Sequence, residues 1–384
     1  MRAKLSELGA VITGNTPSKQ ESKYWASSDI PFIKPDVINQ YGITEVQTAK
    51  DYISEIARSK ARIAEKNVVL VTCIGTIGKI CLTGKECAFN QQINAIIPND
   101  KVLPEYLAYC IYYNRPKLIE LANAPVVPII NKRQFEDFSV NIEESIERQG
   151  SIVTILKEVD RLICYRQKQL QKLDDLVKAR FVELFGAYPH NPMGWKTGTI
   201  RDVVTDVRYG SSRPAVDGGK YPYLRMNNIT YGGELDLSDV KRIDVPENEL
   251  EKCTVRRGDV LFNRTNSKEL VGKTCVYDRD EMMVLAGFVI RVRVNDVVLP
   301  EFLSAFLNTD FSKRTLLGMC KAAIGQANIN AQEMQNIGIY IPPIKLQREF
   351  VQFKNQTDKS KVVIQKAMDE TQLLFDSLMQ EYFK

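Results

Sequence analysis

The sequence predicts an α+β protein made of two copies of one unit, each a globular domain followed by a long helix, with the two helices paired. Two observations lead to this fold class. Short segments recur in the same order about 190–200 residues apart, which indicates that one unit was duplicated. Each copy mixes short β-rich runs with short helices, without regular βαβ alternation, before a long amphipathic segment begins.

The internal repeat runs along the whole chain of 384 residues. Its paired segments are VLPEYL (102–107) and VLPEFL (298–303), IPFIKPDVI (30–38) and YPYLRMNNI (221–229), KNVVLV (66–71) and RGDVLF (257–262), QFEDFSVNI (134–142) and EMQNIGIYI (333–341), and LVKARFVELF (176–185) and LFDSLMQEYF (374–383). The repeat divides the chain into a first domain (1–143), a central helix (144–186), a second domain (187–343) and a C-terminal helix (344–384).

The globular domains contain runs that are typical of strands and of short helices. Proline in the first turn indicates helices at 103–113 and 299–308, because the missing N–H is not needed there. β-branched and aromatic residues predict strands at 68–74, 88–98, 258–263 and 287–294.

The two long segments carry apolar residues at alternating steps of four and three, which is the seam of a coiled coil. Arg166 interrupts the first seam, and Thr357, Ser360 and Thr371 make the middle of the second more polar. We expect the helices to pair, since one helix cannot bury its seam alone; the alternative is that each packs only on its own domain. The predicted seam residues are Ile152, Leu156, Val159, Ile163, Leu170, Leu173, Val177, Phe350, Phe353, Ile364, Leu374 and Leu378.

Composition excludes several classes of protein. The net charge of +5 is compatible with a polyanion partner without proving one. The eight cysteines form no Cys-x-x-Cys pair, so we expect no metal site. Cys73, Cys81 and Cys87 lie close in sequence, and we expect them to be small buried residues of a reduced cytoplasmic protein. No apolar run is long enough to predict an export signal or a membrane span.

The segment SKELVGKT (267–274) almost matches a phosphate-binding loop, but Ser267 stands where the loop needs its first glycine. Gly272 and Lys273 are in register with Gly78 and Lys79 of the first copy, which lacks both that glycine and the hydroxyl after the lysine. Strand-like sequence follows Thr274 where a long helix would be needed. The pattern therefore indicates either a loop glycine with a solvated lysine, or a lysine offered to a phosphate other than that of ATP.

Catalytic motifs are missing from the sequence. Adenine methylation needs an Asn/Asp-Pro-Pro-aromatic loop, and NPMGW (191–195) lacks the second proline. The acidic run PENELEK (246–252) has the wrong spacing for a nuclease, and the single histidine, His190, lies in a linker-like segment. We expect neither catalysis nor a cofactor.

Several of these segments together resemble the specificity subunit of type I restriction–modification systems, over essentially the whole chain. The second copy carries IGQANINAQEMQNIGIYIPPI (324–344), whereas the first departs from this pattern with VVPIIN (126–131) and a helix entry without paired prolines (141–150). The other segments that carry the resemblance are LSELGAVITGNTPSK (5–19), IRDVVTDVRYGSSRPAV (200–216), the runs at 30–38 and 221–229, and the two long helices.

The resemblance implies a non-catalytic DNA-binding subunit. Each globular domain would be a target recognition domain that reads one half of a split double-stranded DNA sequence. The helices would form an antiparallel spacer, and the molecule would be pseudo-twofold. Two methyltransferase subunits would dock on it, with a motor-nuclease subunit as an optional further partner. Two alternatives stay open, a duplicated protein-binding scaffold and a DNA-modifying enzyme with an unrecognised catalytic centre.

Candidate DNA contacts are loop residues of the types that read base edges or hold phosphates. NRTNSK (263–268) is the sharpest group, and we expect Lys79 and Lys273 to face the DNA backbone; the alternative for each residue is an ordinary solvated side chain. Tyr24 and Trp25 are interpreted as core residues. The candidates in the first copy are Thr16, Ser18, Lys19, Lys34, Lys79, Asn90, Gln91 and Gln92. Those in the second copy are Ser211, Ser212, Arg213, Arg225, Asn227, Asn228, Arg264, Asn266, Ser267, Lys268, Lys273, Gln326 and Asn328.

Overall fold

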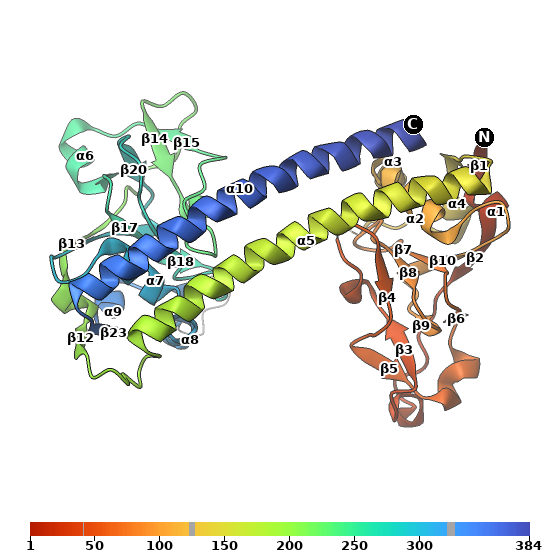
Figure 1. Cartoon of the computed structure of the whole chain (residues 1–384), viewed down its shortest axis with the longest axis horizontal. Coiled ribbons are helices and arrows are strands. Elements are labelled where there is room, and N and C mark those ends of the chain that lie inside the picture. Colours follow the sequence, from red (N-terminus) through yellow and green to blue (C-terminus); the bar gives the residue numbers. More distant parts are fainter. Residues whose placement is uncertain (41, 123–126, 321–326) are drawn as a thin grey trace. The chain divides into compact units, whose positions relative to one another are not determined.

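The computed structural model describes the whole chain except residues 41, 123–126 and 321–326, and it forms two compact units. Unit 1 contains Met1–Gln167 and Gln365–Lys384, and unit 2 contains Lys168–Ile364. Two helices of 40 residues, α5 (Ile146–Phe185) and α10 (Ile344–Phe383), each contribute one half to either unit (Figure 1). The duplicated α+β architecture with long helices is confirmed.

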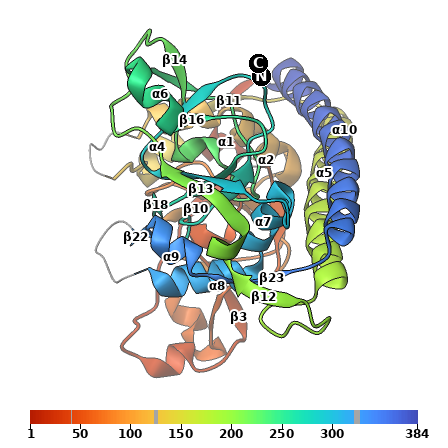
Figure 2. The same ribbon diagram turned by 90° about the vertical axis from the view of Figure 1, so that its left-hand side faces the viewer.

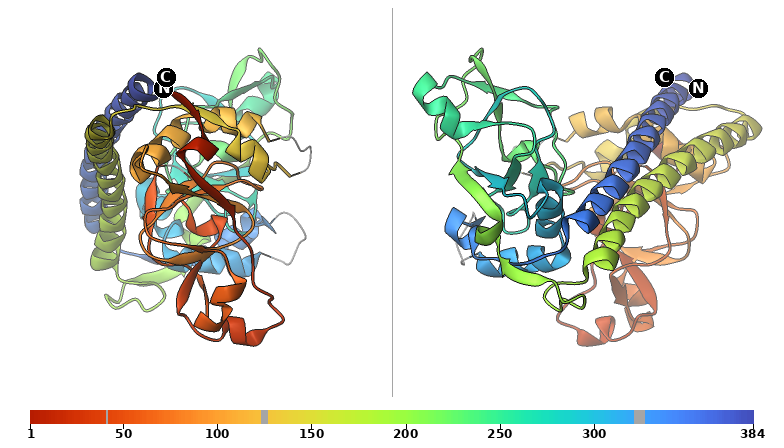
Figure 3. Two further views of the ribbon diagram at one scale, coloured as in Figure 1. Left: turned by 90° about the vertical axis from the view of Figure 1, so that its right-hand side faces the viewer. Right: turned by 60° about the vertical axis from the view of Figure 1, so that its left-hand side comes forward.

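Unit 1 contains two main sheets, one of four strands and one of five strands. The four-stranded sheet, drawn in red to orange, lies at the end of the domain away from α5 (Figures 1 and 3). Its strands, in spatial order, are β5 (Asp51–Ile53), β3 (Ile30–Ile33), β9 (Cys87–Phe89) and β6 (Ile63–Ala64). The five-stranded sheet has the order β2 (Gly9–Thr13), β10 (Ile93–Pro98), β7 (Val69–Thr72), β8 (Ile80–Thr83) and β4 (Thr44–Val46).

The remaining elements of unit 1 close its core. Trp25 packs edge-on against Phe32 with ring centroids 5.3 Å apart, as expected for a core aromatic. A two-stranded pair, β1 (Arg2–Lys4) with β11 (Ser139–Asn141), joins the start of the domain to the chain that enters α5. The helices are α1 (Leu5–Leu8), α2 (Pro104–Tyr113), α3 (Arg115–Glu120) and α4 (Lys132–Glu136), with short 3₁₀ turns η1 (Ser22–Trp25), η2 (Pro35–Val37) and η3 (Glu55–Lys60).

Among its described residues, unit 2 repeats this strand order without a counterpart of β4. Its sheets are β13 (Val204–Tyr209), β21 (Val289–Val294), β17 (Val260–Asn263) and β19 (Thr274–Val276), and β15 (Lys241–Ile243), β14 (Tyr221–Leu224), β20 (Met283–Leu285) and β16 (Thr254–Val255). The small pairs are β12 (Lys196–Thr199) with β23 (Gly338–Ile341), near the end of α5 (Figure 2), and β18 (Thr265–Asn266) with β22 (Ala327–Asn328). The shorter helices are α6 (Glu247–Cys253), α7 (Pro300–Leu307), α8 (Asp310–Met319), α9 (Ala331–Gln335), η4 (Ile200–Val203) and η5 (Met226–Asn228).

The predicted strands and short helices are present, with one difference. The run 88–98 is two strands, β9 and β10, because Asn90, Gln91 and Gln92 form a turn between them. The amide of Gln92 donates to the Asn90 side chain over 3.1 Å, which is the way asparagine stabilises turns.

The long helices run antiparallel within each unit and also pack on the domain of that unit. In unit 1, Ile152 and Leu156 of α5 share one buried cluster with Phe375, Met379 and Phe383 of α10. Arg166, which interrupts the seam, donates hydrogen bonds across the pair to the Ala367 carbonyl and the Thr371 hydroxyl. Pairing and domain packing, which the sequence presented as alternatives, therefore occur together.

In unit 2 the same pairing is aromatic and ionic. Phe181 of α5 lies edge-on to Phe350 of α10, with ring centroids 5.3 Å apart. Arg180 forms an ion pair with Glu349, and Lys361 forms one with Asp174. The two ion pairs and the ring contact place the beginning of α10 beside the end of α5.

One predicted seam residue is wrong. Leu374 is 51% exposed, whereas its neighbour Phe375 is 4% exposed and packs on Tyr109 with ring centroids 6.3 Å apart. The seam continues from the buried Thr371 to Phe375, a step of four, whereas the sequence prediction took a step of three from Thr371 to Leu374, and both steps fit a heptad pattern. The other predicted seam residues are buried or half-buried.

Candidate nucleic-acid interface

The near match to a phosphate loop is a hairpin turn in both copies. Gly78 and Gly272 have φ angles of 76° and 79°, in the left-handed region that glycine enters without strain. Their amides donate to Thr72 and Asn263, each over 2.8 Å, and close the β7–β8 and β17–β19 turns. A strand follows each turn, so the strand–loop–helix arrangement of a phosphate loop is absent at these positions.

The lysine after each of these glycines reaches a corresponding 3₁₀ turn. Lys79 Nζ donates to the carbonyl of Pro35 over 2.9 Å, and Lys273 Nζ donates to that of Met226 over 2.8 Å. Pro35 and Met226 are the first residues of η2 and η5, which follow β3 and β14. The duplicated lysines therefore fasten the same turn in the two domains.

A second basic residue precedes each of these turns. Lys34 forms an ion pair with Asp51, and Arg225 forms one of 2.7 Å with Asp239. These pairs are partly exposed, so each stabilises the fold only weakly and its cation can exchange its partner for another anion. The internal repeat aligns Lys34 with Arg225, and in the structure both residues precede the 3₁₀ turn and form an ion pair with an aspartate.

Four of the predicted contact residues are buried, and we correct the sequence prediction for them: Asn90, Ser211, Asn228 and Lys273. Lys273 is 7% exposed, and burial lowers the pKa of its ammonium group. Asn228 Nδ2 donates to the carbonyls of Asp236 and Asp239 over 2.8 and 3.0 Å. These side chains hold loops in place instead of extending into solvent.

The other predicted contacts lie on accessible loops. Gln326 lies outside the described residues. Arg213 is exposed and makes two hydrogen bonds to the Glu249 carboxylate, over 3.1 and 2.6 Å. The exposed candidates are Ser18, Lys19, Gln91, Ser212, Arg213, Asn227, Lys268 and Asn328, and the half-buried ones are Thr16, Lys34, Lys79, Gln92, Arg225, Arg264, Asn266 and Ser267.

The group NRTNSK runs from the last residue of β17 through strand β18 into the following loop. Asn266 Nδ2 donates to Asn263 Oδ1 over 3.0 Å, and the backbone of Asn266 pairs with that of Ala327. Lys268 projects from the following loop and is exposed. Arg264, Asn266 and Lys268 are thus all at least partly accessible, and their contact with DNA stays a prediction.

Two residues of this region were missed by sequence reasoning. Tyr209 lies under Arg264, whose guanidinium carbon is 4.8 Å from the ring centroid. Lys313 of α8 donates to the carbonyl of Gly272 over 2.9 Å, and burial together with the charge of Lys273 lowers its pKa to about 8. No signal in the sequence links positions so far apart, although Tyr209 is in register with a strand end of the first copy.

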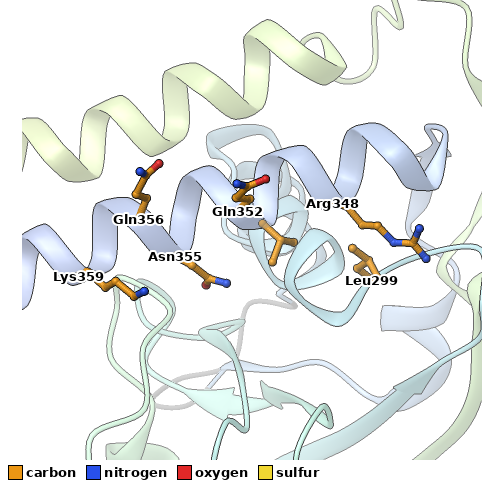
Figure 4. A pocket seen from close by; sticks show the side chains of 7 residues that line it. Leu299, Arg348, Gln352, Asn355, Gln356 and Lys359 are labelled. Atoms are coloured by element: carbon orange, nitrogen blue, oxygen red, sulfur yellow. The ribbon is translucent and has the colours of Figure 1, made fainter.

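A separate surface cavity of unit 2 lies between the start of α7 and the first half of α10 (Figure 4). Its volume is about 440 Å³, and Leu299 at the start of α7 faces the first half of α10 there. The other lining residues are Arg348, Val351, Gln352, Asn355, Gln356 and Lys359. The lining offers amides and cations and no nucleophile paired with a base, so it suits docking more than chemistry.

The described residues contain neither a metal-binding cluster nor a membrane-spanning helix. Among them, no three His, Cys, Asp or Glu side chains are arranged to hold a metal ion. None of the helices in this part of the chain has the length and apolar character needed to cross a membrane.

Comparison with known proteins identifies one family for both halves of the chain. The model of the type I restriction modification DNA specificity domain matches residues 1–174 and again 192–371. The chain is 21% identical to the EcoKI specificity subunit of Escherichia coli K12 over 381 residues, which span 91% of this chain and 80% of that protein. It is 21% identical to the StySPI specificity subunit of Salmonella potsdam, across 98% of this chain and 86% of that protein.

Solved structures with a similar fold come from the same kind of system. The S subunit from M. genitalium superposes with a TM-score of 0.55 at 13% identity, covering 100% of this chain and 96% of that one. A chain from a study of complex assembly and conformational transition of the type I R-M system gives a TM-score of 0.56 at 16% identity, with 100% and 97% covered.

Proposed function

Because the chain belongs to the family of type I restriction modification DNA specificity domains, we propose that its two domains read the two halves of a bipartite DNA target. The first recognition domain comprises residues 1–143 and the second comprises residues 187–343. The helices 144–186 and 344–384 set the gap between the half-sites. The chain itself recognises DNA, while methyl transfer and cleavage belong to other subunits.

The observation that carries this proposal is the duplicated loop framework. Lys79 and Lys273 fasten the same turn, and Gly78 and Gly272 close the same hairpin. The framework is shared while the side chains displayed on it differ, as expected if each domain reads its own bases. Two copies in one chain suit two half-sites, because such a protein can address both with the same surface.

The contact set follows from accessibility and side-chain chemistry. Guanidinium and amide groups match the hydrogen-bonding edges of guanine and adenine, whereas lysine suits phosphate. We assign Arg264, Asn266 and Asn328 to bases, and Lys19 and Lys268 to phosphates. The remaining accessible candidates lie in the same loops and supply further contacts.

Partner subunits are assigned to the helices. Exposed apolar residues occur along the long helices, including Val362, Val363 and Leu373, each at least two-thirds exposed. Apolar surface of this kind favours association. We infer two methyltransferase subunits, one for each half of the molecule, with a motor-nuclease subunit as a further partner, and action on DNA in the cytoplasm.

The test is to co-express the chain with a cognate methyltransferase and to map methylated adenines across a genome. The expected result is a two-part motif with a fixed gap. Exchanging residues 1–143 for those of a relative should change one half of the motif. A change in both halves would contradict modular reading, and DNA binding without sequence preference would favour a protein-binding scaffold.

A control separates recognition from catalysis. The purified chain alone, incubated with DNA and S-adenosylmethionine, should transfer no methyl groups. Methylation by the chain without any partner would instead identify it as an enzyme.

A further inference from the structure

In each domain three loops meet at one residue, and the backbone contacts there are the same. In the first domain, the amide of Cys73 donates to Gln92 over 2.7 Å, and its carbonyl accepts from Ile130 over 2.9 Å. We call this arrangement the three-loop junction. It brings together the end of β7, the 90–92 turn and the segment before α4.

The second domain repeats the junction around Arg264. Its amide donates to Phe288 over 3.0 Å, and its carbonyl accepts from Ile329 over 2.9 Å. Gln92 and Phe288 therefore occupy the same place on the same framework. The alignment was not visible in the sequence, because NQQ and AGF share no residue.

Each junction combines one amide side chain and one apolar side chain. One of them comes from the turn at 92 or 288, and the other comes from the third loop, at 129 or 328. Ile74 pairs with Ile129 in the first domain, and Thr265 pairs with Asn328 in the second. The first junction thus presents an amide at 92 and an apolar group at 129. The second presents an apolar group at 288 and an amide at 328. The amide and the apolar side chain therefore occupy swapped positions in the two domains.

The apolar side chains of the two junctions are not buried in a hydrophobic core. Ile129 is 43% exposed and Phe288 is 50% exposed. The backbone of Phe288 is already held by the Arg264 amide and by Asn263 Nδ2, which donates to it over 3.2 Å. Since these bonds fix the turn, the exposed ring is free for an external contact.

The polar members are preoriented. The amide oxygen of Gln92 accepts from Asn90 Nδ2 over 2.8 Å, which orders the side chain and leaves its NH₂ group to act as a donor. In the second domain, Asn328 Oδ1 accepts from the Thr265 hydroxyl over 3.3 Å. Beside it, Tyr209 supports the Arg264 guanidinium, and the Tyr209 hydroxyl accepts from the Ala331 amide over 2.8 Å. Such ordering before binding lowers the entropy cost of a base contact.

We propose that the two junctions are the specificity-determining surfaces of the two half-sites, with residues 92 and 129 in one and 288 and 328 in the other. The amide contacts a hydrogen-bonding base edge, and the apolar side chain contacts a thymine methyl group. Arg264 adds a guanine contact in the second half-site, where the first domain has the buried Cys73. The inference rests on the proposed function and names the residues that give it selectivity.

Exchange of the junction residues tests this directly. The variants are Phe288→Gln with Asn328→Ile, and Gln92→Phe with Ile129→Asn. Each is co-expressed with the methyltransferase, and methylated motifs are sequenced. We expect the preferred bases to change in one half-site only, by about tenfold in relative methylation, while the other half is retained.

Controls make each outcome decisive. Ile97→Asn changes a residue that is 40% exposed at the other end of β10, and it should leave the motif unaltered. Thermal unfolding of every variant is compared with that of the wild type, so that a loss of the fold is distinguished from a change in the motif. Folded exchange variants with an unchanged motif, or with both halves changed, would overturn the junction proposal. A wild-type protein with no two-part motif would overturn the proposed function itself.

Discussion

Gln149 and Gln347 make the same three hydrogen bonds in the two copies of the duplicated unit. Each side-chain oxygen accepts from the amide before a short helix, Leu103 or Leu299, over 2.8 Å. Each NH₂ group donates to two carbonyls, at 3.0 and 2.7 Å for Gln149 and at 3.0 and 2.8 Å for Gln347. Both side chains are fully buried. They fix the first turn of each long helix to its domain.

Replacing this glutamine should weaken one unit at a time. Gln347→Leu leaves buried backbone groups without partners, and we expect a loss of about 2–4 kcal/mol of local stability. The measurement is hydrogen exchange of the Leu299 amide, which should accelerate, while the Leu103 amide keeps its rate. Gln149→Leu should give the reverse pattern. Gln352→Leu, an exposed change on the same helix, serves as the control. Equal acceleration at both amides would show that the two attachments are not independent.

The stability of unit 2 should rise with pH through the titration of Lys313. Burial and the neighbouring charge of Lys273 lower the Lys313 pKa from 10.5 to about 8. Between these values the unfolded chain binds more protons than the folded one, so stability increases as pH rises above about 8, by up to about 3 kcal/mol. Urea unfolding at pH 7.5 and 9 should show about 1 kcal/mol of this gain in the wild type and none of it in Lys313→Met. Because buried thiols such as Cys275 have raised pKa values and act in the opposite direction, the difference between the two proteins is the quantity to compare.

Two lysines of the second domain should behave differently toward DNA. Lys268 is exposed, so Lys268→Ala should weaken binding to all sequences and reduce the salt slope by about 0.9. Lys273 is buried and donates to Met226, so Lys273→Met should lower stability and leave the salt slope unchanged. Binding titrations at several salt concentrations distinguish the two. If Lys273→Met alone flattened the slope, the buried ammonium group would have to move to the DNA on binding.

The duplication, the long helices and most strands could be predicted because they depend on local patterns that occur twice. The junctions could not, because Gln92 and Phe288 correspond only through backbone bonds to residues far along the chain. Lys273 shows a different limit. A lysine in a loop motif usually lies in solvent, and its burial here depends on the carbonyl of Met226, 47 residues away in sequence. Contacts at that distance leave no periodicity to detect.

Residues 374 and 375 are neighbours on α10 but differ in burial. Phe375 is 4% exposed and packs in the cluster of unit 1, whereas Leu374 is 51% exposed. Phe375→Ala should cost about 3–5 kcal/mol, because it removes a large buried side chain and leaves a cavity. Leu374→Ala should cost less than about 1 kcal/mol, since it removes surface atoms from a helix and installs a good helix former. Denaturant unfolding, monitored by exchange of the Tyr109 amide, compares the two. Equal costs for the two variants would restore Leu374 to the seam.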